Sequence, residues 1–183
     1  GTWANVLQNP ETAQKCGIRV GLLMDLSNSI SASQLTTYKN STKAFVDALE
    51  GTPSSVALWT FASQSPAAGT ANVNRPLTSV ADQAGANQVK GWIEGLALPG
   101  GQAGGTNWDA GLWNVAQGAD VDVLLVLTDG SPTQSGITST SGSGNWSNCR
   151  VVEEGVFSAN AVKDKGTAVI AAGHARGPGS RQL

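Results

Sequence analysis

Oxygen-bearing side chains at alternating positions follow the first apolar run of the sequence. The run covers residues 18–24, and Asp25, Ser27 and Ser29 come directly after it. A carboxylate and two hydroxyls at the end of a buried strand could serve as three ligands of one hard cation, because such cations bind oxygen. In isolation, however, the pattern is more typical of residues that cap the start of a helix. Its meaning therefore depends on the rest of the chain.

Two later segments supply the missing members of such a site. Thr106 follows the glycine-rich residues 100–105, and Asp129 follows the apolar residues 121–127. In open α/β sheets, ligands bind beyond the carboxyl ends of the strands. We therefore expect Asp25 and Asp129 to project from the same sheet edge, within reach of Thr106.

The side chains of the predicted cation site are Asp25, Ser27, Ser29, Thr106 and Asp129. Their oxygens suit Mg²⁺, which prefers oxygen ligands and retains several waters, and Mn²⁺ or Ca²⁺ are alternatives. An ordinary zinc site is excluded, because the chain has one histidine and two distant cysteines. Nucleotide binding is not expected either, since residues 100–105 lack the lysine of a phosphate-binding loop and no strand directly precedes them.

Composition narrows the classes of function. The 183 residues suffice for one domain with a sizeable core, which we assign to residues 1–183 with a lead-in over 1–17. The net charge of −2 offers no basic patch for nucleic acid. No apolar run reaches the ~20 residues that cross a bilayer, and no signal peptide is visible. The 23 glycines, with many Ser, Thr, Asn and Gln, are typical of an extracellular surface protein.

Strand and helix patterns alternate along the chain. The apolar runs predict strands at 18–24, 56–61, 121–127 and 167–172, and helical spacing predicts helices from the Ser31 cap to Gly51, over 82–96, after Thr106 and over 152–165. Residues 62–78 are rich in loop formers and leave room for one short edge strand. Strands separated by helices indicate a doubly wound α/β domain with a mostly parallel central sheet.

Cys16 and Cys149 are the two cysteines of the chain. They are either unrelated buried thiols or a disulfide that ties the entry to the first strand to the loop before the last predicted helix. A bridge over a loop of that length would stabilise the fold by roughly 4–5 kcal/mol on the chain-entropy model. It would also place the protein outside the cytosol. We take the disulfide as the working prediction.

The five oxygen ligands, in this order, resemble the metal-ion-dependent adhesion site of von Willebrand factor A domains, a family that includes the integrin inserted domain. The segments 104–112 and 158–163 are similar to those of bacterial surface and pilus-tip members. The resemblance implies that the Ser27, Ser29 and Thr106 hydroxyls can bind metal directly, while one or both carboxylates act through waters. It also implies a further strand and helix after residues 167–172, and we expect this C-terminal part of the fold to be truncated in the sequence.

The function implied by the resemblance is Mg²⁺-dependent adhesion without catalysis. The metal would bridge to an acidic side chain of a protein partner, on a bacterial cell surface or pilus. Candidate residues at the rim of the site, able to touch that partner, are Asn28, Asn107, Trp108 and Trp146. The alternative is an intracellular domain that works beside an AAA-type ATPase or a metal chelatase, and a disulfide would favour the surface role. A third, less favoured function is that of a metal-dependent hydrolase, because no general base besides Asp25 and Asp129 is evident.

Overall fold

The computed structural model describes residues 4–11, 16–137 and 149–173, and these form an α/β domain. The elements in chain order are β1 (Arg19–Asp25), α1 (Ala32–Leu49), β2 (Ser55–Phe61), β3 (Arg75–Ser79), α2 (Gln83–Gly95), the 3-10 helix η1 (Gly101–Ala103), α3 (Trp108–Ala116), β4 (Val123–Thr128), α4 (Cys149–Asp164) and β5 (Ala168–Gly173). Every predicted strand and helix is confirmed, with boundaries that shift by one to three residues. The possible edge strand within 62–78 is β3, which extends to Ser79.

One mixed sheet organises the domain, with strand order β3-β2-β1-β4-β5. β1 pairs in parallel with both β2 and β4, and β4 pairs in parallel with β5. β3 alone runs antiparallel, at the edge beside β2. The mostly parallel, doubly wound architecture is therefore confirmed. β1 lies at the centre of the sheet, so the loop that follows it emerges between the loops that follow β2 and β4.

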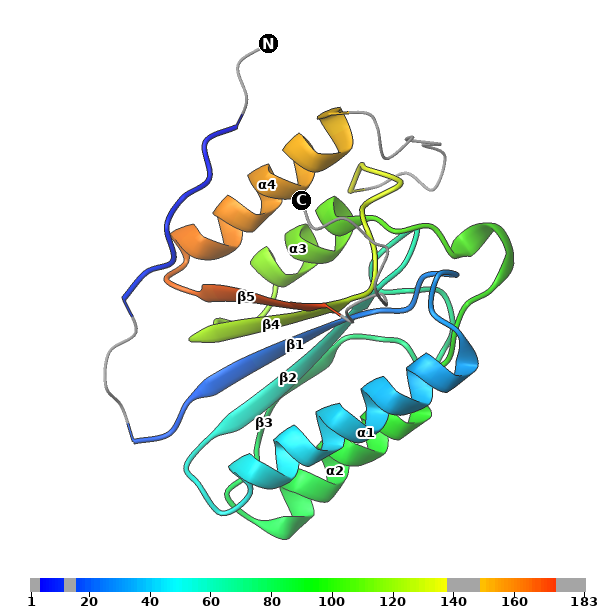
Figure 1. Ribbon diagram of the computed structural model, residues 1–183. Helices are drawn as coiled ribbons and strands as arrows, with labels where there is room; N and C mark the ends of the chain where they lie inside the picture. The colour runs from blue at the N-terminus through cyan, green and yellow to red at the C-terminus, as the bar shows by residue number, and fades with distance from the viewer. Residues whose placement is uncertain (1–3, 12–15, 138–148, 174–183) are drawn as a thin grey trace, which may run out of the picture.

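Helices cover both faces of the sheet (Figure 1). α1 and α2 pack on one face, over a core that includes Leu22, Met24 and Leu58. α3 and α4 lie on the other, over a core that includes Leu23 and Phe61. Side chains of β1 alternate between the two cores, as the period of two in a strand requires. Burial on both faces explains why this strand is continuously apolar in sequence.

The start of α1 is fixed by the capping box predicted from the sequence. The Ser31 hydroxyl accepts from the backbone N–H of Gln34, and the Gln34 side chain accepts from the backbone N–H of Ser31. At the other end, Gly51 has a φ of 80°, a left-handed conformation that suits glycine and stops the helix. These caps fix both ends of the helix that follows the first oxygen-rich loop.

An extended N-terminal segment, residues 4–11, lies against α4 and β5 (Figure 1). The Asn9 side chain donates to the Val169 carbonyl and accepts from the Val169 N–H, at 3.0 and 2.9 Å. Asn160 of α4 bonds the same segment at Asn5 and Leu7. The segment thus satisfies backbone groups at the free edge of β5. No helix within the described ranges is long and apolar enough to cross a membrane.

Substitution of alanine at two helical glycines should have opposite effects on stability. A Cβ on Gly111 of α3 would stand 2.9 Å from the ring of the buried Phe61, whereas a Cβ on Gly91 of α2 would meet nothing within 4 Å. We expect Gly111→Ala to lower the free energy of unfolding by about 1–3 kcal/mol. Gly91→Ala should raise it by about 0.5–1 kcal/mol. Urea unfolding measures both, and a loss of stability in both variants would contradict this packing.

Candidate metal centre

The candidate centre lies where β1 and β4 end side by side. The register pairs Met24 with Leu127, so Asp25 stands beside Thr128, the last residue of β4. The Thr128 hydroxyl donates a hydrogen bond to Asp25 Oδ2 at 2.6 Å. Asp129 follows directly on the same edge. The parallel pairing of two strands therefore brings together two acidic residues that are about a hundred positions apart.

A continuous chain of hydrogen bonds connects four of the five predicted ligands. The backbone N–H of Ser27 donates to Asp25 Oδ1 at 2.8 Å. The hydroxyls of Ser27 and Ser29 lie 2.9 Å apart, and the Ser29 hydroxyl donates to Asp129 Oδ1 at 2.7 Å. The alternation of Asp25, Ser27 and Ser29 along the loop thus places their oxygens in one cluster with Asp129.

The glycine-rich loop that leads to Thr106 packs against the first loop through Asn28. The Asn28 backbone N–H donates to the Gly104 carbonyl, and its side-chain amide donates to the Gly101 carbonyl, both at 2.7 Å. A Cβ on Gly104 would stand 2.0 Å from the Asn28 side chain. Glycine at position 104 is therefore required for this close approach.

Thr106 is held at the same edge by the loop that follows β4. Its backbone N–H donates to the Thr133 hydroxyl at 3.0 Å, and its carbonyl accepts from the Thr133 N–H at 2.8 Å. Thr106 is buried, with 5% of its surface exposed. The hydrogen bonds of the described residues do not connect its hydroxyl to the Asp25–Asp129 chain. Hydrogen bonds of the Thr106 backbone thus hold the fifth predicted ligand at the site.

Burial dominates the electrostatics of Asp25. The residue is fully buried, and this desolvation raises the pKa of its carboxyl group from 3.8 to about 6. Hydrogen bonds from Thr128 and Ser27 act in the opposite direction, and the negative charge of Asp129 raises the pKa further. The carboxylate is thus held at the end of β1 at a cost in free energy, which a neighbouring cation would offset.

Two further polar groups near the site lack a partner among the described residues. The hydroxyl of Tyr38, on α1, is buried without a hydrogen bond, and so is the side-chain carbonyl of Gln134, which packs over Gly105. Burial, followed by the negative charges of Asp129 and Asp25, raises the pKa of Tyr38 to about 12. Tyr38 therefore lies within the electrostatic range of both carboxylates.

Sequence reasoning missed three residues that support the site. Thr128 could have been found, because it directly precedes Asp129 and a hydroxyl beside a carboxylate is an evident donor. Thr133 carried no such signal, since its role depends on how a loop folds back. Helical spacing places Tyr38 on the inward face of α1, as the structure does, but spacing does not show that its hydroxyl lies near the two carboxylates. Local sequence does not determine either feature.

The donor set fits a hard divalent cation. Its side-chain atoms are oxygens only, and the two carboxylates match a charge of +2. Among the described residues, no three or more His, Cys, Asp or Glu side chains are grouped in a way that could hold a metal ion. A cation at this edge would therefore depend on hydroxyl ligands in addition to Asp25 and Asp129.

The prediction that Asn107 lies at the rim is wrong. Asn107 is fully buried, and its side-chain carbonyl accepts from the Ala110 N–H at 3.0 Å, which caps the start of α3. Its amide donates to the carbonyls of Ser63 and Gly136, both at 3.0 Å. Asn107 therefore fixes the loops around Thr106 and has no surface to offer a partner.

The remaining rim candidates differ in exposure. Asn28 is exposed beside the predicted ligands, as expected. Trp108 is half-buried, and its buried indole N–H has no hydrogen-bond partner within the described residues. It forms one wall of an apolar cavity with Phe61 and Leu112. Trp146 lies outside the described residues, as does any chain after Gly173.

The predicted disulfide between Cys16 and Cys149 is not formed, because both thiols are free and exposed. The topology gives the reason. Cys16 precedes β1, which begins at the amino edge of the sheet, whereas Cys149 opens α4, which begins at the carboxyl edge (Figure 1). β1 has seven residues and spans about 23 Å, while bridged cysteines need Cα atoms within about 7 Å.

Asp109 is a second buried carboxylate, and it has a structural role. It lies in the first turn of α3 and accepts hydrogen bonds from the Ser158 hydroxyl of α4 and from the Gly136 N–H, the latter at 3.0 Å. It therefore ties α3, α4 and the loop that follows Asp129 together. These contacts help to hold the loop against Thr106.

Neutralisation of Asp25 should stabilise the protein in the absence of metal. Burial raises the pKa of Asp25 in the folded state, so the carboxyl group does not reduce the free energy of unfolding below about pH 4. The free energy of unfolding then falls as the pH rises through about 6. The loss reaches up to about 3 kcal/mol. In EDTA at pH 7.5, the free energy of unfolding of Asp25→Asn should therefore be about 1–3 kcal/mol higher than that of the wild type. At pH 4 the variant should show no such gain. Urea unfolding at both pH values measures this, and a variant less stable at pH 7.5 would contradict it.

The fold of the chain is similar to that of part of three solved structures. The pilus adhesin SpaC from Lactobacillus rhamnosus GG matches at 17% identity and a TM-score of 0.68, over 91% of this chain and 26% of that one. Proximal thread matrix protein 1 from the mussel byssus matches at 21% identity and a TM-score of 0.61, over 88% and 39%. A von Willebrand factor type A protein from Catenulispora acidiphila matches at 14% and 0.53, over 88% and 40%.

No protein-family model and no curated protein matches the sequence. The chain spans less than half the length of these three solved structures, so it corresponds to one part of each. At these identities the likeness concerns the fold. The chain thus has an α/β fold shared with a von Willebrand factor type A protein and with a pilus adhesin.

Proposed function

We propose that the chain is a Mg²⁺-dependent protein-binding module of the adhesion type. Asp25, Ser27, Ser29, Thr106 and Asp129 would hold the cation at the carboxyl edge of the sheet. The cation would supply a coordination position for a carboxylate of the partner. The observation that carries this proposal is the hydrogen-bonded chain from the buried Asp25 through two serine hydroxyls to Asp129.

The residues of the candidate centre would have different roles in binding the cation and the partner. Asp25, fixed by Thr128 and by the Ser27 N–H, supplies negative charge from the protein interior. Neutral hydroxyls next to the cation would leave its charge poorly quenched, which favours an anionic oxygen from outside. Ser29 and Asn28 are exposed, so this side of the cluster is open to a partner.

An extracellular role on a cell surface or pilus is part of the proposal. It is supported by the fold shared with a pilus adhesin and by the composition. The free state of Cys16 and Cys149 removes the disulfide as an argument for that location. We propose binding rather than catalysis, because both acidic groups of the centre belong to the candidate ligand set.

Metal binding is the first consequence to test. We expect Mg²⁺ at a hundredfold excess over its Kd to raise the free energy of unfolding by about 2.7 kcal/mol. EDTA should reverse the gain. Asp129→Ala should abolish it, because one of the two carboxylates is lost. Calorimetric titration and urea unfolding with and without Mg²⁺ measure these effects.

The matched control is Asp47→Ala, which removes an exposed carboxylate that pairs with Lys90 between α1 and α2. This variant should bind Mg²⁺ as the wild type does. Equal binding by wild type and Asp129→Ala would show that the metal lies elsewhere or that no specific site exists.

Partner binding through the metal is the second consequence. A random peptide library on phage, captured by the chain in Mg²⁺ and eluted with EDTA, should yield peptides that contain Asp or Glu. Replacement of that acid by its amide should weaken binding at least about tenfold, roughly 1.4 kcal/mol. Peptides that stay bound in EDTA, or that lack an acid, would contradict a metal bridge.

A further inference from the structure

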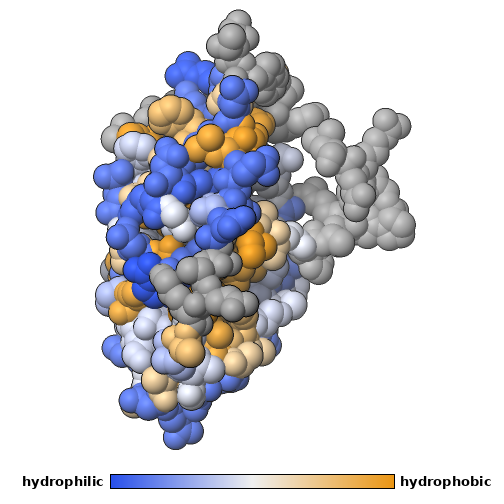
Figure 2. Space-filling view, turned by 90° about the vertical axis from the view of Figure 1, so that its left-hand side faces the viewer, coloured by the Kyte–Doolittle hydropathy of each residue, from blue (hydrophilic) through white to orange (hydrophobic). Residues whose placement is uncertain are grey.

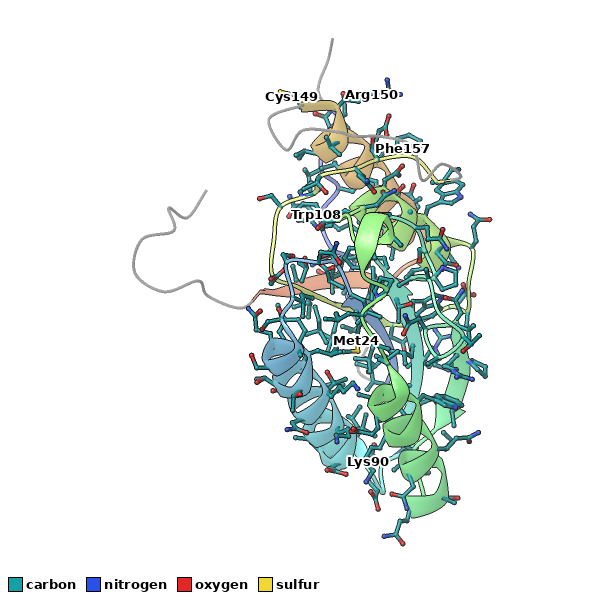
Figure 3. All side chains as sticks on the ribbon, turned by 90° about the vertical axis from the view of Figure 1, so that its right-hand side faces the viewer. Met24, Lys90, Trp108, Cys149, Arg150 and Phe157 are labelled. Atoms are coloured by element: carbon teal, nitrogen blue, oxygen red, sulfur yellow. The ribbon has the colours of Figure 1, made fainter. Side chains whose placement is uncertain are left out.

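The loops around the candidate centre are almost free of charge. Four described loops meet at the carboxyl edge of the sheet, on the right of Figure 1 and toward the viewer in Figure 3: residues 26–31, 62–74, 97–107 and 129–137. They contain one charged residue, the predicted ligand Asp129. Ser, Thr, Asn, Gln, Gly, Ala and Pro make up most of the rest. We name these four loops the ligand face.

The opposite edge of the sheet has a different character. Its loops and helix ends carry charged side chains: Glu50, Asp82, Asp120, Asp122 and Lys165. Figure 2 faces this end and shows strongly hydrophilic residues over much of the surface, with hydrophobic ones between them. The lack of charge is therefore a property of the ligand face and not of the molecule as a whole.

Two pairs of opposite charge lie on the helices that border the ligand face. On α1 and α2, the Lys43 ammonium group lies 2.6 Å from a carboxylate oxygen of Glu94. At the start of α4, Arg150 lies 2.7 Å from a carboxylate oxygen of Glu154. These pairs offer little net field to a molecule that approaches the centre, because opposite charges in contact largely cancel at a distance.

A bound dication would leave the ligand face close to neutral. Its charge of +2 balances the carboxylates of Asp25 and Asp129, and the face adds no other charged side chain. What remains exposed is hydrogen-bonding capacity: the side chains of Asn28, Ser29, Gln64, Thr70 and Ser131 are all exposed. Attraction for an anion is then short-ranged and confined to the metal itself.

We propose that the ligand face selects a partner segment in which one carboxylate stands among uncharged polar residues. This inference rests on the proposed metal bridge and specifies its partner. A second acidic group of the partner would find no cation in the described part of the face, and the nearest charged side chain there would be the half-buried carboxylate of Asp129. Basic groups beside the carboxylate would find no acid on the four described loops beyond the metal ligands.

Two physical consequences follow. Affinity should fall as acidic residues are added around the essential one, because each added charge is desolvated without a counter-charge. Affinity should also depend little on ionic strength, because long-range steering requires a net field on the surface. A partner recognised through an acidic patch would show the reverse of both.

Three synthetic peptides, displayed at equal density on a biosensor, test the proposal on the full chain. One has a single Asp among Gly, Ser, Thr and Asn, the second has two Glu added beside this Asp, and the third has two Lys added. In saturating Mg²⁺ the first should bind at least about threefold more tightly than the other two. Its affinity should change less than about twofold between 0.05 and 0.5 M NaCl.

A lysine on the ligand face should alter this preference. Gln64→Lys places a cation next to Ser63, whose hydroxyl accepts from the Gly105 N–H. We expect it to favour the peptide with added Glu and to make its binding salt-dependent. The matched control Gln83→Lys adds the same charge at the exposed start of α2, at the other end of the domain, and should leave the order unchanged.

The outcomes distinguish failure of the neutral partner segment from failure of the metal bridge. Tighter Mg²⁺-dependent binding of the peptide with added Glu to the wild type, lost at high salt, would overturn the neutral partner and leave the metal bridge intact. Binding that is unaffected by EDTA, or no binding of any peptide in Mg²⁺, would overturn the bridge and the partner class together.

Discussion

The buried carboxylate of Asp25 is the feature on which the rest of the site depends. It ends the central strand of the sheet with no exposed surface, and desolvation raises its pKa to about 6. A folded protein retains such a cost where a ligand or a function offsets it. The contacts from Thr128 to Ser29 are arranged around this group and would determine where the proposed cation lies.

The fold delivers the remaining oxygens through simple geometry. The central position of β1, paired in parallel with β2 and β4, makes three loops emerge as neighbours at one edge. Small residues then allow these loops to approach closely, as Gly104 does beneath Asn28. Buried polar side chains such as Asn107 and Asp109 hold the loops in place through hydrogen bonds with backbone groups. The sheet thus determines which edge the side-chain oxygens occupy, and the loop contacts fix them relative to one another.

Much of this arrangement could be predicted from the sequence, because it follows from periodicity. The alternation of Asp25, Ser27 and Ser29 after an apolar run predicts their cluster, and the parallel sheet predicts that Asp129 joins them. Asn107 could not be placed correctly, since a polar residue between a loop and a helix can equally be a buried cap or an exposed contact. The prediction of a Cys16–Cys149 disulfide was wrong. It was based on the number of cysteines, which does not show that the two residues lie at opposite edges of the sheet. The contact between Thr133 and Thr106 depends on the path of a loop, which local residue types do not determine.

The neutral character of the ligand face connects the fold to specificity. Charged residues occur at the amino edge and on the helices, while the four described loops of the ligand face carry only Asp129. Recognition would then depend on one strong, short-ranged contact through the metal, with hydrogen bonds around it. Such a surface discriminates by the placement of a single carboxylate rather than by the net charge of the partner.

A crystal structure of the chain grown with Mn²⁺, with anomalous scattering recorded at the manganese edge, tests the central claim most directly. We expect one strong peak at the carboxyl edge of β1 and β4, within about 2–4 Å of oxygens from Asp25, Ser27, Ser29, Thr106 and Asp129, with at least one coordination position taken by water or by a neighbouring molecule. No peak at this edge, or a metal whose positions are all filled from within the chain, would contradict a site built to bridge to a partner.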